Sequence, residues 1–179
     1  MDIGVISVRY ARALLKSATD AKLEDQTYAQ MQLLVRCYLE LPALRQTIDN
    51  PMLSKDKKQA LLLTAVGGNQ ALPLVKAFIE LILKEDREDM IQFMAASYVT
   101  LYRQQKNIIR GKLTTAVPVS PQMEQKMRQM VESRTQGTVE FETEVDTGII
   151  GGFILEYDTY RMDSSVKSKL NTILNTLNK

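Results

Sequence analysis

The first 105 residues carry apolar side chains at intervals of three to four positions, a spacing typical of amphipathic helices. Asn50-Pro51 and Gly67-Gly68 each mark the end of a helix, and Ser54 is a suitable N-cap for the next one. Helices are therefore predicted over residues 3–18, 25–40, 43–48, 54–66, 71–84 and 86–105. Their short connections favour antiparallel neighbours, so residues 1–105 are expected to form a six-helix bundle.

After residue 106 the apolar pattern changes from the period of a helix to that of a strand. Apolar and polar residues alternate over 109–117 and 139–145, and a further strand is expected over 149–157. Ser120-Pro121 begins a helix that reaches about residue 134, and Asp163-Ser164-Ser165 caps a last helix over 166–177. The chain is thus predicted to be α+β, with the helical bundle followed by a small β-α-β-β-α domain over residues 106–179.

Composition excludes several kinds of chemistry. There are 23 Lys and Arg against 21 Asp and Glu, a net charge of +2, no histidine and one cysteine. Histidine-based catalysis, histidine-ligated metals and internal disulfides are therefore excluded, and the charge is too small to indicate a nucleic-acid partner. The longest uncharged stretch, residues 59–75, is interrupted by glycine and proline, so no membrane-spanning segment is expected.

Three features of the sequence could carry chemistry, and each has a simpler structural interpretation. Residues 148–152 are rich in glycine but lack the Gly-Lys-Ser/Thr ending of a phosphate loop, so Gly151-Gly152 indicates a bulge or a close backbone approach. The carboxylates at positions 140, 142 and 144 could bind a hard cation, but a solvated strand face is the simpler interpretation. Cys37 is interpreted as a small buried apolar residue. We therefore expect no cofactor and no metal.

Several motifs together resemble the delta subunit of F-type ATP synthase, the family that includes the mitochondrial oligomycin-sensitivity-conferring protein. The segment 139–156, with its alternating strand, acidic turn and Gly151-Gly152, resembles the family pattern. Asp163-Ser164-Ser165-Val166 and the Leu-rich last helix follow it in the order that the family shows. The segment 9–14, Arg-Tyr-Ala-Arg-Ala-Leu, resembles the family's opening. Asp158 departs from the pattern, because many members have glycine there.

The resemblance implies a stator linker that is not an enzyme. Such a linker holds the catalytic head against the turning rotor by joining it to the peripheral stalk. In this family the bundle, residues 1–105, binds the N-terminal helix of an alpha subunit in a groove between its first and fifth helices. The candidates that we expect to be exposed in this groove are Tyr10, Ala11, Leu14, Leu15, Leu74, Phe78, Leu81 and Ile82. The sequence leaves open that they only pack the bundle, because both roles use the same apolar side chains.

The C-terminal domain, residues 106–179, is implied to grip the end of the b-subunit stalk. The expected contacts lie on the last helix, at Val166, Leu170 and Leu174. The implied location is peripheral, on the cytoplasmic side of a bacterial inner membrane, without nucleic-acid binding or direct membrane insertion. Two alternatives stay open: a free-standing helical adaptor that binds another amphipathic helix, and an enzyme with an unrecognised site.

Overall fold

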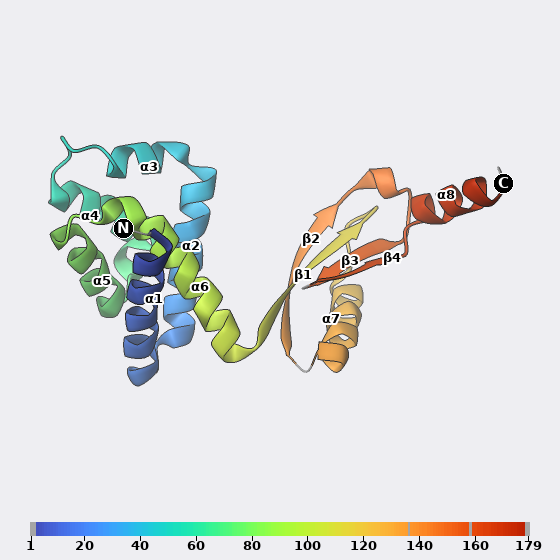
Figure 1. Cartoon of the computed structure of the whole chain (residues 1–179), viewed down its shortest axis with the longest axis horizontal. Coiled ribbons are helices and arrows are strands. Elements are labelled where there is room, and N and C mark those ends of the chain that lie inside the picture. Colours follow the sequence, from blue (N-terminus) through green and yellow to red (C-terminus); the bar gives the residue numbers. More distant parts are fainter. Residues whose placement is uncertain (1–2, 136, 158, 178–179) are drawn as a thin grey trace. The chain divides into compact units, whose positions relative to one another are not determined.

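The computed structural model describes residues 3–135, 137–157 and 159–177, and it divides the chain into two compact units, Met1–Gln104 and Gln105–Lys179 (Figure 1). Within these residues the chain has eight α-helices and a four-stranded mixed sheet, so the predicted α+β class is confirmed. The predicted β-α-β-β-α order is one strand short, because Tyr160–Asp163 pairs with the preceding strand as a fourth. The elements in the first unit are α1 (Ile3–Asp20), α2 (Glu24–Glu40), α3 (Pro42–Ile48), α4 (Lys55–Ala65), α5 (Pro73–Lys84) and α6 (Ile91–Lys106), which ends just past the boundary.

The core of the first unit is built from the apolar faces of these helices. The largest side chains that are completely buried in it are those of Tyr98, Met31, Leu34, Ile48, Leu62, Ile79, Ile82, Ile91 and Met94. Burying a side chain of this size contributes about 1.5–3 kcal/mol each. The core therefore accounts for the periodic apolar stripes of the sequence.

The start of α5 is fixed by a buried side chain on a different helix. Gln30 on α2 accepts a hydrogen bond from the backbone N–H of Leu72 at 3.1 Å and donates one to the carbonyl of Gln70 at 2.8 Å. Pro73 then occupies the first helical position, so α5 starts two residues later than predicted. No local sequence pattern indicates this bond between residues about 40 positions apart.

A buried ion pair joins the end of the α5–α6 connection to α4. Lys58 Nζ lies 2.7 Å from Glu88 Oε1, and their side chains are only 5% and 16% exposed. Glu88 belongs to a short 3₁₀ turn, Glu88–Met90, that leads into α6. The pair therefore ties the beginning of α6 to a distant helix. The predicted N-cap of α4, Ser54, stands at the expected position, but its side chain makes no capping hydrogen bond.

The second unit contains a sheet with strand order β2-β1-β3-β4. Its elements are β1 (Ile108–Thr115), α7 (Pro121–Thr135), β2 (Thr138–Val145), β3 (Phe153–Tyr157), β4 (Tyr160–Asp163) and α8 (Val166–Leu177). The first two strands are parallel, which requires a crossover, and α7 supplies it. The other two pairs, β1–β3 and β3–β4, are antiparallel.

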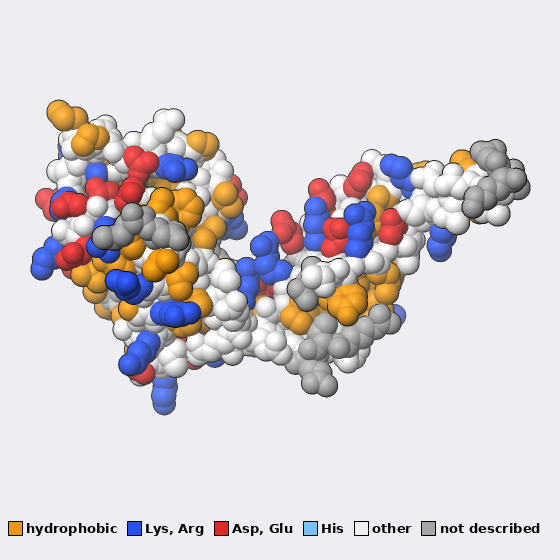
Figure 2. Space-filling model, viewed as in Figure 1, with side chains coloured by type: hydrophobic (Ala, Val, Ile, Leu, Met, Phe, Trp, Pro, Cys, Tyr) orange, Lys and Arg blue, Asp and Glu red, His pale blue; other side chains and the backbone are white. Residues whose placement is uncertain are grey.

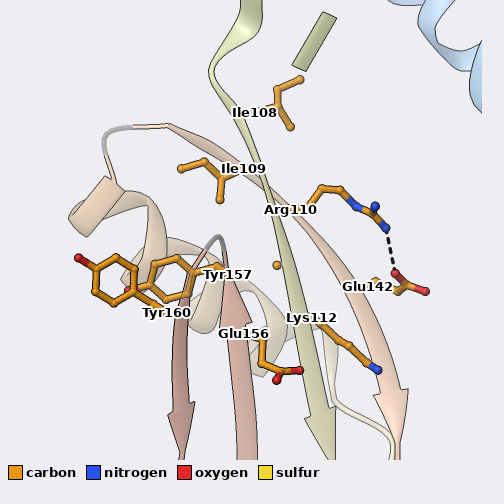
Figure 3. A pocket seen from close by; sticks show the side chains of 9 residues that line it. Ile108, Ile109, Arg110, Lys112, Glu142, Glu156, Tyr157 and Tyr160 are labelled. Atoms are coloured by element: carbon orange, nitrogen blue, oxygen red, sulfur yellow. Dashed lines mark hydrogen bonds and ion pairs between the residues drawn. The ribbon is translucent and has the colours of Figure 1, made fainter. Parts of the chain in front are cut away.

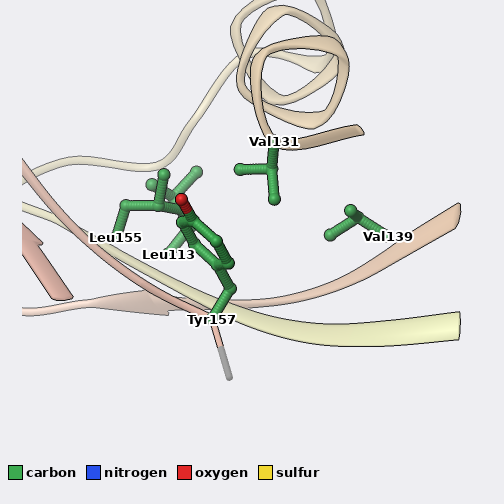
Figure 4. Packing of buried hydrophobic residues seen from close by; sticks show 5 residues of the cluster. All are labelled: Leu113, Val131, Val139, Leu155 and Tyr157. Atoms are coloured by element: carbon green, nitrogen blue, oxygen red, sulfur yellow. The ribbon is translucent and has the colours of Figure 1, made fainter. Parts of the chain in front are cut away.

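One face of this sheet packs against α7. Leu113, Val139, Leu155 and Tyr157 from three strands meet Val131 of α7 and are all buried (Figure 4). Gly111 of β1 lies on the same face of the sheet as Leu113, next to the side chains of Phe141 and Val139. A Cβ atom there would stand 2.5 Å from Cε1 of Phe141, so only glycine lets β1 and the Phe141 ring approach this closely.

The third predicted strand is too long at its N-terminal end. Residues 147–149 form a short 3₁₀ turn instead, because the side chain of Asp146 accepts a hydrogen bond from the N–H of Gly148 at 2.8 Å. Ile150 then has a φ of +71°, which no regular strand permits. Gly151 and Gly152 consequently precede β3, although the predicted close backbone approach is present at Gly152. Asp158 lies outside the described residues.

Candidate functional site

The carboxylates of β2 occupy the solvent-facing side of the sheet, where basic side chains of β1 neutralise them. Arg110 Nη2 lies 3.3 Å from Glu142 Oε2, and Lys112 Nζ lies 2.7 Å from Glu144 Oε2. Hydrogen bonding to Glu144, together with its charge, raises the pKa of Lys112. Figure 3 shows Arg110 reaching toward Glu142. Both residues line a hollow of about 700 Å³. The interpretation of these carboxylates as a solvated face is confirmed, with added cross-strand ion pairs.

The described part of the chain contains no metal centre. No group of three or more acidic or cysteine side chains there could hold a metal ion. Cys37 is half-buried, not fully buried as expected, and its Sγ lies 3.7 Å from the carbonyl oxygen of Ala65. Across the same described residues, no helix is both long and apolar enough to cross a bilayer.

The residues predicted to be exposed along α1 and α5 mostly lie inside the helical unit. The prediction of exposure is wrong for Ala11, Leu14, Leu15, Phe78 and Ile82, all of which are buried. The reason is that each helix turns its most regular apolar stripe toward the core, where the largest apolar area is removed from water. Whether these residues also contact a partner stays a prediction.

The other three predicted residues are accessible. Leu81 on α5 is 47% exposed, and Tyr10 and Leu74 are half-buried. The guanidinium of Arg87 stacks 5.5 Å from the centre of the Tyr10 ring and donates a hydrogen bond to its hydroxyl at 3.3 Å. Tyr10 is therefore held in place at the surface by the α5–α6 connection.

A second apolar face of α1 was not anticipated from the sequence. A shallow hollow of about 510 Å³ on this helix is lined by Gly4, Val5, Val8, Arg9 and Arg12. Val5 is 56% exposed, and neither arginine forms an ion pair within the described residues. Figure 2 shows hydrophobic and basic side chains gathered together on the visible face of the helical unit. The sequence feature that could have predicted this face is the spacing of Val5, Val8 and Arg12, which places them on one side of a helix. We call Val5, Val8, Arg9 and Arg12 the α1 outer face.

The last helix presents a continuous apolar stripe to solvent. Val166, Leu170 and Leu174, the predicted stalk contacts, are 38%, 47% and 55% exposed, and Ile173 between them is equally accessible. Their spacing of three to four residues puts them on one side of α8. Single exposed apolar residues are ordinary on protein surfaces, but an aligned set of four indicates an interaction surface. We call these four residues the α8 stripe.

This α+β chain has accessible apolar helix faces in both of its units, which is characteristic of an interaction protein. The family model of the ATP synthase delta (OSCP) subunit matches residues 6–177. The chain belongs to this family, whose members are non-catalytic stator subunits of the ATP synthase peripheral stalk.

Individual relatives agree with this membership. ATP synthase subunit delta of Phocaeicola vulgatus is 44% identical over 173 residues, covering 97% of this chain and 94% of the relative. The subunit of the same name from Bacteroides thetaiotaomicron is 37% identical over 174 residues, with the same coverage of both chains. A chain in the cryo-EM structure of the Toxoplasma gondii mitochondrial ATP synthase hexamer has the same fold, with a TM-score of 0.65, 19% identity and 97% of each chain covered.

Proposed function

We propose that this chain joins the catalytic head of an F-type ATP synthase to its b-subunit stalk, with one unit for each partner. In this arrangement the helical unit, as a six-helix bundle, binds the N-terminal helix of an alpha subunit, and the C-terminal unit binds the stalk. The observation that carries the proposal is that each unit of a stator-family chain has its own accessible apolar helix face. A strut that resists rotation needs two separate attachments, because a single one would let the head turn with the rotor.

The helical unit would hold the alpha-subunit helix at its surface over α1 and α5. Leu81 and Val5 offer the most exposed apolar side chains on these helices, and Tyr10 and Leu74 are partly accessible. The buried members of the predicted set, such as Leu14 and Ile82, would support this surface from below. An amphipathic helix laid on such a surface buries its own apolar face, which is the usual mode of helix-in-groove recognition.

The charge of the α1 outer face adds a preference for the partner. Arg9 and Arg12 lie beside the apolar hollow of Val5 and Val8. Carboxylates on the bound helix would be attracted to these two arginines, chiefly increasing the rate of association at low salt. The bound helix would therefore carry acidic side chains next to its apolar ones.

The C-terminal unit would hold the stalk along α8. The α8 stripe extends over more than two turns of helix, enough to pack against one side of a stalk helix. Membership of the family and the absence of a spanning helix in the described residues support a peripheral location, and we place it on the cytoplasmic side of a bacterial inner membrane.

The test measures each attachment with matched variants of the full chain. Val5→Asp and Leu81→Asp should each weaken binding of a synthetic alpha-subunit N-terminal peptide, measured by calorimetry, by about tenfold or more. Lys57→Asp, on the exposed side of α4, is the control and should leave the affinity unchanged. Leu14→Asp is unsuitable here, because Leu14 is buried and an aspartate would destabilise the core.

For the stalk, Leu170→Asp should weaken capture of the cytoplasmic part of the b subunit, whereas Asn175→Asp, off the stripe on the same helix, should not. Unchanged capture by the Leu170 variant and by a chain lacking residues 166–177 would move the stalk site elsewhere. If neither partner binds the unaltered chain, the adaptor alternative takes the place of the stator linker.

A further inference from the structure

The helix that carries the α8 stripe has little packing of its own. From Lys167 to Thr176 every described side chain is exposed except that of Ser168, which is half-buried. A helix of 12 residues without a packed face is marginal in water, so contacts at its N-terminal end must hold it. Those contacts are made by Gly151, Gly152, Asp163, Ser165 and Ser168, which we call the α8 junction.

The first part of the junction is a pair of backbone hydrogen bonds to the segment before β3. The N–H of Ser164 donates to the carbonyl of Phe153 at 2.9 Å, and the N–H of Val166 donates to the carbonyl of Gly151 at 2.9 Å. These bonds continue the antiparallel pairing of β3 with β4, whose last pair joins Ile154 to Asp163. The start of α8 is therefore attached to the segment that leads into β3 through main-chain atoms, which have far less freedom than side chains.

The two glycines make this attachment possible. Gly152 has a φ of +77°, and a Cβ atom on it would lie 2.3 Å from the carbonyl oxygen of Ser164. Both the backbone conformation and the space exclude any other residue. A Cβ on Gly151 would lie 3.1 Å from Cγ2 of Val166, the first residue of the α8 stripe. The glycine pair thus brings two backbones together at the base of α8.

The second part of the junction is a double cap. Asp163 accepts a hydrogen bond from the N–H of Ser165 at 2.9 Å through Oδ1 and one from the hydroxyl of Ser168 at 2.7 Å through Oδ2. The N–H of Ser168 donates to the hydroxyl oxygen of Ser165 at 3.2 Å, and Ser165 is itself buried. An ordinary N-cap supplies one such bond, whereas Asp163, the last residue of β4, bonds both to Ser165 just before the helix and to Ser168 in its first turn.

We propose that the α8 junction fixes the direction of α8 relative to the sheet, and that this fixed direction strengthens binding to the stalk. The proposal rests on the proposed function of α8 as the stalk-binding helix. A helix that is already held in its bound direction loses little freedom on association, whereas one that swings about its first turn must be ordered by the partner. In a stator, the same junction would pass the load from the stalk to the sheet.

The test follows the direction of α8 in the full chain by spin labelling. Cys37→Ala removes the native thiol, and labels are placed at Asn171→Cys on α8 and Gln129→Cys on α7, both exposed positions in the same unit. The parent should give a narrow distance distribution by pulsed electron resonance. Gly152→Ala should broaden it and weaken b-subunit capture by about tenfold, while the intact cap of Asp163 and Ser165 keeps α8 helical by circular dichroism. A narrow distribution or unchanged capture in this variant would overturn the proposal.

Two further variants keep the test decisive. Asn175→Ala is the control, because this exposed residue of α8 lies outside the α8 junction, and it should leave both readouts unchanged. Ser168→Ala removes one bond of the cap without touching the glycine pair, so it replaces Gly152→Ala if that variant fails to fold. The spin-label distances test the junction in the absence of any partner. Unchanged capture by a chain lacking residues 166–177 would instead overturn the assignment of α8 to the stalk.

Discussion

Single residues in this protein are most informative where a polar group is buried. The sequence gives no reason to pair Lys58 with Glu88, since 30 positions separate them. In the fold they form a nearly buried ion pair, and the second carboxylate oxygen of Glu88 has no hydrogen-bond partner among the described residues. The chain also contains a matched pair at the surface, Lys55 with Asp86, whose side chains are 52% and 76% exposed. The two pairs allow burial to be tested with the same chemical change.

We expect Lys58→Met to lower the free energy of unfolding by about 3–5 kcal/mol, because it leaves the Glu88 carboxylate buried without its counter-charge. Lys55→Met should cost about 0–1 kcal/mol, since its partner stays hydrated. Urea unfolding followed by circular dichroism measures both. Equal losses for the two variants would show that the Lys58 pair is hydrated in solution.

The carboxyl of Asp163 should make stability depend on pH in the acid range. Hydrogen bonds from Ser165 and Ser168 lower its pKa from 3.8 to about 2. A group whose pKa is lower in the folded state stabilises the protein above the unfolded value and loses this effect as the pH falls toward the folded value. The thermal midpoint of the parent should therefore exceed that of Asp163→Asn at pH 6. The difference should shrink between about pH 4 and 2, and a constant difference would contradict the assignment.

Secondary-structure elements follow their sequence patterns closely, but their ends depend on other parts of the chain. The strand β3, which ends at Tyr157, begins later than its apolar pattern suggests, because Asp146 forms a turn with Gly148. Similarly, α5 begins where Gln30 of α2 bonds to the backbone. Alternation and period identify an element, whereas its first residue is decided by hydrogen bonds that come from outside it.

The close contact between β1 and β2 gives a prediction at this scale. Gly111→Ala should destabilise the C-terminal unit by about 1–3 kcal/mol, because its Cβ would stand 2.5 Å from the ring of Phe141. Adding Phe141→Leu should recover part of the loss, since the smaller side chain makes room for the methyl group. Thermal unfolding of the parent, the two single variants and the double variant gives the unfolding free energies for a double-mutant cycle. Additive losses would show that the ring moves away freely.

At the scale of the whole molecule, the chain consists of two units with different architectures, and each has its own accessible apolar helix face. Two weak attachments to the same complex act together, because the second one forms within an assembly that is already bound. The stator role therefore depends on both units being present in one chain more than on the strength of either face.

This cooperation can be measured on purified ATP synthase from which the corresponding subunit has been removed, by following how fast the added chain dissociates. Val5→Asp and Leu170→Asp should each raise the dissociation rate about tenfold, and the double variant should dissociate far faster than either. Surface plasmon resonance provides the dissociation rates. The control is the double variant of Lys57→Asp and Asn175→Asp, which should dissociate as slowly as the parent. If the double variant dissociates no faster than one of the single variants, the two faces do not contribute separately.

Periods, caps and motif order are local properties of the chain, so the class of the fold, most of the elements and the family could be inferred from the sequence. The sequence also pointed to Val166, Leu170 and Leu174 of the α8 stripe, whose side chains are exposed in the described structure. Packing in three dimensions settles which apolar residues of α1 face inward, since Leu14 is buried and Val5 is 56% exposed although both side chains are aliphatic. Likewise, the role of Gly151-Gly152 became visible once folding had brought Ser164 against them, because a close approach of two backbones is a property of space and not of sequence.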